Sequence, residues 1–214
     1  MKVKRYEWRF IATGCALTIF FFIIVNYITK TQYPWFIYPT LLLLLLPLGL
    51  YCIFEKKHTL FSLVGSFLIL LYLVTENYLN TPDYPWVLYA VAPIVLWPVL
   101  ILLGKRNNSM FVACTISTFF ILYYVILNIY LAPPYPWAIF PAFAILWWPL
   151  SLYHVKRKSY FAFSVSAAIF ISLFFISVNV FFSPRTIWAV YPAFAVLWWP
   201  LSMYYYYYRR KVDY

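Results

Sequence analysis

Long runs of uncharged, mostly apolar residues alternate with short charged or turn-forming segments along the whole chain. A helix needs about 20 apolar residues to cross the hydrocarbon core of a bilayer. Most runs have room for one such helix, but residues 107–155 contain the turn sequence Ala-Pro-Pro-Tyr-Pro and have room for two. The pattern predicts eight membrane-spanning helices, at about residues 10–28, 35–54, 59–79, 86–103, 110–131, 137–154, 160–182 and 188–207.

A short motif recurs along these segments at a constant spacing of 51 residues. Tyr33-Pro34-Trp35, Tyr84-Pro85-Trp86 and Tyr135-Pro136-Trp137 show it in full, and Thr186-Ile187-Trp188 keeps only the tryptophan. An asparagine precedes each motif and a proline follows it in the second span, both at the same step. Repetition at a fixed period is typical of tandem structural units. The candidate sites are the positions shared by all four copies: Asn26, Asn77, Asn128, Asn179, Trp35, Trp86, Trp137, Trp188, Pro47, Pro98, Pro149 and Pro200.

Each copy of the motif is predicted to be a hairpin of two spans. We expect an all-α membrane protein with eight transmembrane helices, arranged as four tandem two-helix repeats within one membrane domain. Because each unit contains two spans, all four units are parallel, unlike the inverted repeats of many transporters. The predicted units are residues 1–54, 55–104, 105–154 and 155–214.

Each recurring residue has a physical role to which its chemistry is suited. Tryptophan prefers the water–lipid boundary. A proline inside a helix deprives the carbonyl four residues earlier of its donor, so we expect a kink in each second span. The asparagine leaves two interpretations open. Its four copies could line a path for a ligand or ion, or they could cap the turns and form interhelical hydrogen bonds. The carbonyls freed by proline are those of Leu43, Ile94, Ile145 and Val196.

Composition and charge exclude a soluble protein and predict an orientation. Of the 214 residues, 66% are apolar and only 10% are charged, with a formal net charge of +11. A soluble domain carries about a quarter charged residues. With eight spans, 14 of the 16 lysines and arginines share the side of the two termini, and only Lys30 and Arg185 lie opposite. The positive-inside rule then places both termini in the cytoplasm of a bacterial cell, with the protein in the inner membrane.

The distribution of the cations also bears on partners. They are scattered over short connectors and are not gathered on one folded face, which is typical of contact with lipid headgroups. We therefore expect membrane lipids as partners, with another membrane protein as a second candidate, and no nucleic acid.

Few residues could carry chemistry, and we expect neither an enzyme nor a cofactor or metal site. Cys15, Cys52 and Cys114 show no metal-ligand or disulfide spacing and are expected to be buried, inert thiols. Glycine occurs four times and never as a GxxxG pair.

The remaining ionisable residues are also not expected to form a catalytic or ligand site. Glu76 and Asp83, near the second turn, are interpreted as surface charge. His58 and His154 belong to the opposite side at different places in their units, which does not favour a shared metal or haem site.

The third copy carries a family resemblance. Its segment Asn128…Pro136-Trp137-Ala138-Ile139-Phe140-Pro141…Trp147-Trp148-Pro149-Leu150…His154 resembles the bacterial two-transmembrane (2TM) domain family, which would cover nearly the whole chain as four copies. That family has a Gly-rich stretch after the inner tryptophan, where Pro149 and Ser151 stand here, and a histidine at its end, which only His154 matches. The resemblance implies the hairpin fold and supplies no catalytic residues.

Three functional hypotheses follow. The first is a non-enzymatic, multi-pass membrane protein with a structural, accessory or envelope-protecting role that acts through partners. The second is a channel or transporter in which the four units close into a pseudo-fourfold ring around a path. The third is an aromatic-lined pocket for a lipid or other hydrophobic small molecule.

Overall fold

The computed structural model describes residues 7–30 and 33–206, and every regular element within these ranges is helical. The chain divides into two compact units, Met1–Gly104 and Lys105–Tyr214. The boundary between them falls between the second and third predicted repeats. Each unit is described by itself below.

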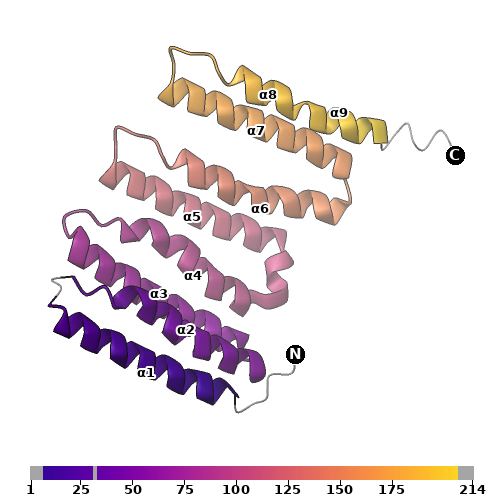
Figure 1. Cartoon of the computed structure of the whole chain (residues 1–214). Coiled ribbons are helices and arrows are strands. Elements are labelled where there is room, and N and C mark those ends of the chain that lie inside the picture. The colour runs from indigo at the N-terminus through magenta and orange to yellow at the C-terminus, as the bar shows by residue number, and fades with distance from the viewer. Residues whose placement is uncertain (1–6, 31–32, 207–214) are drawn as a thin grey trace. The chain divides into compact units, whose positions relative to one another are not determined.

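The first unit consists of two helical hairpins (Figure 1). Hairpin one is formed by α1 and α2, and hairpin two by α3 and α4. The packing runs from each helix to the next one along the chain, so α2 and α3 form the joint between the two hairpins. The helices are α1 (Glu7–Ile28), α2 (Ile37–Phe54), α3 (His58–Asn80) and α4 (Val87–Leu103).

The second unit also consists of two hairpins, preceded by a 3₁₀ turn (Figure 1). Hairpin three is formed by α5 and α6, and hairpin four by α7 with the pair α8 and α9. Here α6 and α7 form the joint, and α7 packs against both α8 and α9. The elements are η1 (Gly104–Asn108), α5 (Met110–Leu131), α6 (Ile139–Arg157), α7 (Tyr160–Phe182), α8 (Val190–Val196) and α9 (Trp198–Tyr204).

Small side chains let the two helices of a hairpin approach closely. In α3, Ser62 and Ser66 are buried, and in α7 the matching positions are Ser164 and Ala168. Small residues four apart lie on one face of a helix, and in lipid such faces allow tight packing. The sequence has no GxxxG pair, so this close packing of helices was not predicted from it. Here serine and alanine provide the small side chains that glycine provides in a GxxxG pair.

The two connectors within the units have the same backbone conformation. Lys56 (φ 54°) and Lys158 (φ 52°) are both left-handed. The residue after each donates its N–H to a carbonyl five residues earlier, Lys57 to Cys52 at 2.8 Å and Ser159 to His154 at 3.1 Å. This is the Schellman arrangement that ends a helix, here with lysine at the position where glycine is usual. We call this end of each hairpin the connector end, and the opposite end the turn end.

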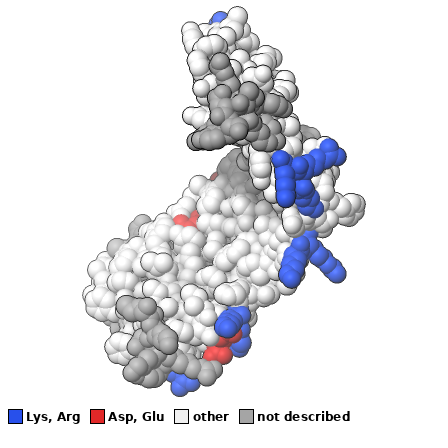
Figure 2. All heavy atoms as spheres, turned by 90° about the vertical axis from the view of Figure 1, so that its right-hand side faces the viewer, with Lys and Arg blue, Asp and Glu red and all other residues white. Residues whose placement is uncertain are grey.

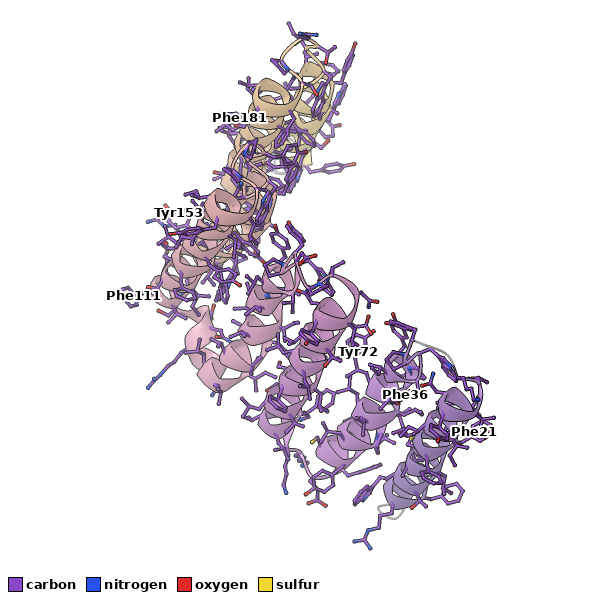
Figure 3. All side chains as sticks on the ribbon, turned by 90° about the vertical axis from the view of Figure 1, so that its left-hand side faces the viewer. Phe21, Phe36, Tyr72, Phe111, Tyr153 and Phe181 are labelled. Carbon is purple, nitrogen blue, oxygen red and sulfur yellow. The ribbon has the colours of Figure 1, made fainter. Side chains whose placement is uncertain are left out.

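Six of the described helices are long and apolar enough to cross a membrane: α1 from Trp8, α2, α3, α4 extended through η1, α5 and α7. Their large apolar side chains are widely exposed, as Phe21, Phe111 and Phe181 show in Figure 3. In water such exposure would be costly, whereas in lipid it needs no compensation. The protein is therefore a multi-pass helical membrane protein.

The last predicted span differs from the expectation of one continuous helix. Within residues 188–206, the described part of this span, there are two short helices, α8 and α9, separated at Leu197. Pro200 has no N–H to donate to the carbonyl of Val196, so the helical hydrogen bond between these two residues is missing. By contrast, α2, α4 and α6 continue through Pro47, Pro98 and Pro149.

Candidate functional site

The recurring asparagine closes the turn of each hairpin. In hairpin three, the Asn128 Nδ2 donates 2.8 Å hydrogen bonds to the carbonyls of Ala132 and Tyr135, and its Oδ1 accepts one of 2.9 Å from the N–H of Ala138. One side chain thus joins the last turn of α5, the connecting loop and the start of α6. It satisfies backbone groups that a helix end leaves without partners.

The same arrangement is present in the other hairpins. Asn77 bonds to the carbonyls of Thr81 and Tyr84 and to the N–H of Val87. Asn179 makes the equivalent bonds to Ser183, Thr186 and Ala189, and also accepts from the N–H of Trp188. Asn26 donates to the carbonyl of Tyr33 at 3.1 Å. These contacts favour the capping interpretation, because the amides of Asn77, Asn128 and Asn179 are buried in their own turns.

The tryptophan that follows each turn is half-buried against the first helix of its own hairpin. Trp35 meets Phe22 edge to face at 5.6 Å, and Trp137 and Trp188 meet Tyr124 and Phe175 at 6.0 Å. In these three hairpins the aromatic partner lies thirteen residues before the tryptophan. In hairpin two that position is Leu73, and the Trp86 Nε1 instead donates to the Thr81 hydroxyl at 2.8 Å.

The prolines of the second spans lie inside helices. One of the carbonyls that they leave without a helical donor accepts a hydrogen bond from a neighbouring helix. The Ser66 hydroxyl of α3 donates a 3.0 Å hydrogen bond to the Ile94 carbonyl, which Pro98 leaves without its helical partner. Ser117 occupies the matching position in hairpin three and is buried, but its hydroxyl has no hydrogen-bond partner among the described residues.

Glu76 departs most from the expectation. It was predicted to be surface charge, and this is wrong, because only 7% of the side chain is exposed. Its carboxylate lies in the joint between hairpins one and two, where Tyr33 contacts both oxygens at 3.0 Å, Tyr38 contacts one at 3.2 Å and the Asn80 Nδ2 contacts one at 2.8 Å. Asp83, by contrast, is exposed as expected.

Further contacts complete this cluster, which we call the Glu76 cluster: Tyr33, Tyr38, Tyr72, Glu76 and Asn80. The hydroxyls of Tyr33 and Tyr38 are hydrogen-bonded to each other, and the Asn80 Nδ2 also contacts the Tyr33 hydroxyl at 3.2 Å. Tyr72, which is labelled in Figure 3, lies one turn before Glu76 and meets Tyr38 edge to face at 6.1 Å. An ionisable group within a membrane span is costly and is usually retained for function.

One histidine and two of the three cysteines are buried within the described residues. His154 is buried at the connector end, where its Nδ1 lies 3.0 Å from the Ser159 hydroxyl and its ring meets Phe163. Cys15 and Cys52 are buried as predicted, but Cys114 is exposed, so that expectation is wrong for one thiol. Within the ranges that the structure describes, no three His, Cys, Asp or Glu residues are grouped to hold a metal ion.

The cations of the connectors are exposed. Figure 2 shows lysine and arginine side chains at the surface of the molecule. Some of them lie over aromatic rings, as Arg157 does over Tyr153 at 4.4 Å. The exposed connector cations are Lys56, Lys57, Lys105, Arg106, Lys156, Arg157 and Lys158.

No protein-family model matches the chain, and no curated protein or solved structure matches it either. The functional argument therefore depends on the residues and contacts described above.

Proposed function

We propose that the protein is a non-enzymatic membrane scaffold that acts through lipid and protein contacts along its helices. One observation carries the proposal: in each unit the packing runs between consecutive helices, while large apolar side chains remain exposed on them. Repeats that contact mainly their neighbours form extended surfaces, and such surfaces are suited to binding. Membrane lipids would cover them, with another membrane protein as a second candidate partner, whereas nucleic acid is not an expected partner.

The proposal includes four tandem two-helix units and eight membrane crossings. The support is the asparagine turn in all four copies, 51 residues apart, which joins a first helix to a second. The two crossings beyond the six apolar helices would be α6, whose end carries His154, Lys156 and Arg157, and the α8–α9 pair. At 1.5 Å per residue, the 19 residues of α6 are about 28 Å long, close to the thickness of the hydrocarbon core.

The proposed location is a bacterial inner membrane with both termini in the cytoplasm. The support is the charge asymmetry: with eight crossings, 14 of the 16 lysines and arginines in the sequence fall on the side of the two termini. Cysteine labelling of intact cells and inverted vesicles tests this. In a background without native cysteines, Asn108→Cys should be labelled only from the cytoplasmic side, and Asp83→Cys and Arg185→Cys only from the opposite side. Labelling of Asn108→Cys and Arg185→Cys from one side would contradict eight crossings.

A channel or transporter formed by the four units is the second candidate. The observation that favours it is the buried carboxyl of Glu76 within a span, because such groups often mark ion or proton paths. An argument against a channel or transporter is that the prolines and tryptophans of the second spans would line a path with few polar groups.

Flux measurements separate the two candidates. Purified full-length protein is reconstituted into liposomes, and proton, potassium and chloride flux is compared with protein-free liposomes. The scaffold predicts equal rates. Flux that depends on the protein and falls in the Glu76→Gln variant would overturn the scaffold and support a transport function.

A further inference from the structure

A groove opens in the second unit, toward the connector end of hairpin three. Its volume is about 320 Å³, and it lies between the start of α5, the second half of α6 and the middle of α7. Two of the residues that line it, Leu146 and Tyr153, are each 38% exposed, so the groove is accessible from outside the helices. All six lining residues have apolar or aromatic side chains: Met110, Leu146, Pro149, Leu150, Tyr153 and Phe170.

The length of the groove matches one leaflet of a bilayer. Along α6 the lining runs from Leu146 to Tyr153, and Arg157 follows one turn later. At 1.5 Å per residue, the helix rises about 16 Å from Leu146 to Arg157. This rise is about half the thickness of the hydrocarbon core. An acyl chain that lies in the groove therefore has its headgroup at the level of Arg157.

Cations are present where that headgroup would lie. The Arg157 guanidinium is 4.4 Å from the centre of the Tyr153 ring, and Arg157 is exposed, as are its sequence neighbours Lys156 and Lys158. Residues 105–206, the described part of the second unit, contain no aspartate or glutamate, so no carboxylate of this part can neutralise these cations. A guanidinium can bind a phosphate group through two parallel hydrogen bonds, so a lipid phosphate is a suitable counter-ion.

Hairpin one differs at the corresponding positions. Trp8 and Tyr51 lie 102 residues before Met110 and Tyr153, and their rings pack against each other at 5.2 Å. A tryptophan is therefore present where hairpin three has the smaller side chain of methionine. The position that corresponds to the arginine of the groove is Glu55, an acid. Hairpin three thus differs from hairpin one at both positions in the direction that favours an anionic lipid.

We propose that this groove binds one anionic phospholipid, with an acyl chain against α6 and the phosphate on Arg157. The apolar lining accepts the chain, and the guanidinium and the neighbouring lysines accept the charged headgroup. Basic pockets between membrane helices bind anionic headgroups in the same way. The proposal rests on the lipid contacts of the proposed function and makes one of them specific, because this lipid is held at a single site.

Native mass spectrometry of the purified full-length protein tests the site. The protein is incubated with equimolar phosphatidylglycerol and phosphatidylcholine that have identical acyl chains. Wild type should retain phosphatidylglycerol in preference, as one molecule per chain. Arg157→Gln should lower this retention about tenfold, because it removes the charge-assisted hydrogen bonds to the phosphate. Arg9→Gln is the matched control: it removes the same charge from an exposed arginine 5.7 Å from the centre of the Trp8 ring, and it should bind like wild type.

A second variant tests the groove without changing any charge. Met110→Trp introduces the residue that hairpin one has at the corresponding position, and its ring should fill the groove and lower the retention of phosphatidylglycerol. Retention at the wild-type level would mean that the lipid is held outside the groove, and the proposal would fail. Thermal unfolding in the same detergent shows whether this variant folds. If it does not, Arg157→Gln and Arg9→Gln decide the test, because both alter exposed side chains.

Other outcomes contradict the site directly. Equal retention of the two lipids by wild type, or equal retention of phosphatidylglycerol by Arg157→Gln and Arg9→Gln, would overturn the proposal. A bound mass that belongs to a protein in place of the lipid would overturn it as well. The flux measurements are judged separately, since protein-dependent flux contradicts the scaffold whether or not lipid is bound. Loss of selective lipid retention without flux contradicts only this site.

Discussion

The Ser66 hydroxyl of α3 donates a 3.0 Å hydrogen bond to the carbonyl oxygen of Ile94 in α4. Pro98 has no N–H with which to close the helical bond to that carbonyl, so the serine replaces a missing backbone donor from the neighbouring helix. A proline inside a span is tolerated when a neighbour satisfies the freed group. Hairpin two therefore combines a helix defect with its compensation.

Ser66→Ala should destabilise hairpin two by about 1 kcal/mol, since it removes one hydrogen bond and leaves the Ile94 carbonyl without that donor. Thermal unfolding in lipid nanodiscs, followed by circular dichroism, measures the change. Ser117→Ala is the matched control: its hydroxyl is buried without a described partner, so its removal should be neutral or slightly stabilising. Equal losses in both variants would show that the hydrogen bond has no role.

Asn128→Ala should destabilise hairpin three by about 2 kcal/mol. The substitution removes three hydrogen bonds at the turn, and each is worth about 1 kcal/mol net, partly replaced by water at the membrane boundary. The exposed Asn108 in the connector serves as control, and Asn108→Ala should leave the melting temperature unchanged. Hydrogen exchange of the Ala138 amide gives a local measure, because this N–H loses its acceptor only in Asn128→Ala.

The helices could be located from the sequence because each apolar run is long and bounded by charges or turn residues. Seven predicted spans agree with single helices to within a few residues, as with α3 and α7. The break at Leu197 could not be predicted from the same pattern, because Pro47, Pro98 and Pro149 occupy matching positions in continuous helices. The proline alone therefore does not determine whether the helical pattern continues.

The site was predictable only where its partners are close in sequence. The asparagine lies seven residues before the carbonyl that it binds, so capping of the turn was one of the two interpretations that the sequence allowed. The Glu76 cluster joins residues 43 positions apart, and a repeat of 51 residues conceals it because neighbouring copies have no acid there. Comparing the chain at steps of 102 residues would have revealed that one joint is polar and the other aromatic.

The connector end of hairpin one contains a hydrogen bond whose donor, a lysine ammonium, is titratable. The Lys57 ammonium donates a 2.9 Å hydrogen bond to the Tyr51 hydroxyl and lies 5.1 Å from the centre of that ring. This hydrogen bond raises the pKa of Lys57 above its ordinary value. Because the pKa is raised in the folded state, the stabilisation is present at neutral pH and is lost as the pH rises through the folded value in the alkaline range.

Tyr51→Phe should therefore lower the pKa of Lys57 toward its ordinary value, since the acceptor is lost while the ring remains. Titration of isotopically dimethylated lysines by NMR measures this shift. Tyr153→Phe, which alters a ring beneath Arg157 in the second unit, should leave the Lys57 titration unchanged. An unchanged Lys57 titration in Tyr51→Phe would show that the hydrogen bond is absent in the membrane.

Phe143→Ala should weaken the joint between hairpins three and four, because Phe143 of α6 stacks on two rings of α7. Its centroid lies 4.0 Å from that of Phe174 and 4.8 Å from that of Phe170, with interplanar angles of 17° and 29°. Aromatic pairs contribute about 0.5–1.5 kcal/mol each beyond the area they bury, so the loss should be about 2 kcal/mol. Lipid offers little hydrophobic gain between helices, so ring packing contributes much of the stability of this joint.

The control for this prediction is Phe111→Ala, which removes a side chain that is 79% exposed and should leave the melting temperature unchanged. A double-mutant cycle separates the ring contact from a general loss of volume. If Phe143 and Phe174 stabilise the joint through each other, the cost of Phe143→Ala should shrink in the Phe174→Ala background. Additive costs would mean that the two rings act independently and that the aromatic stack is not what holds α6 to α7.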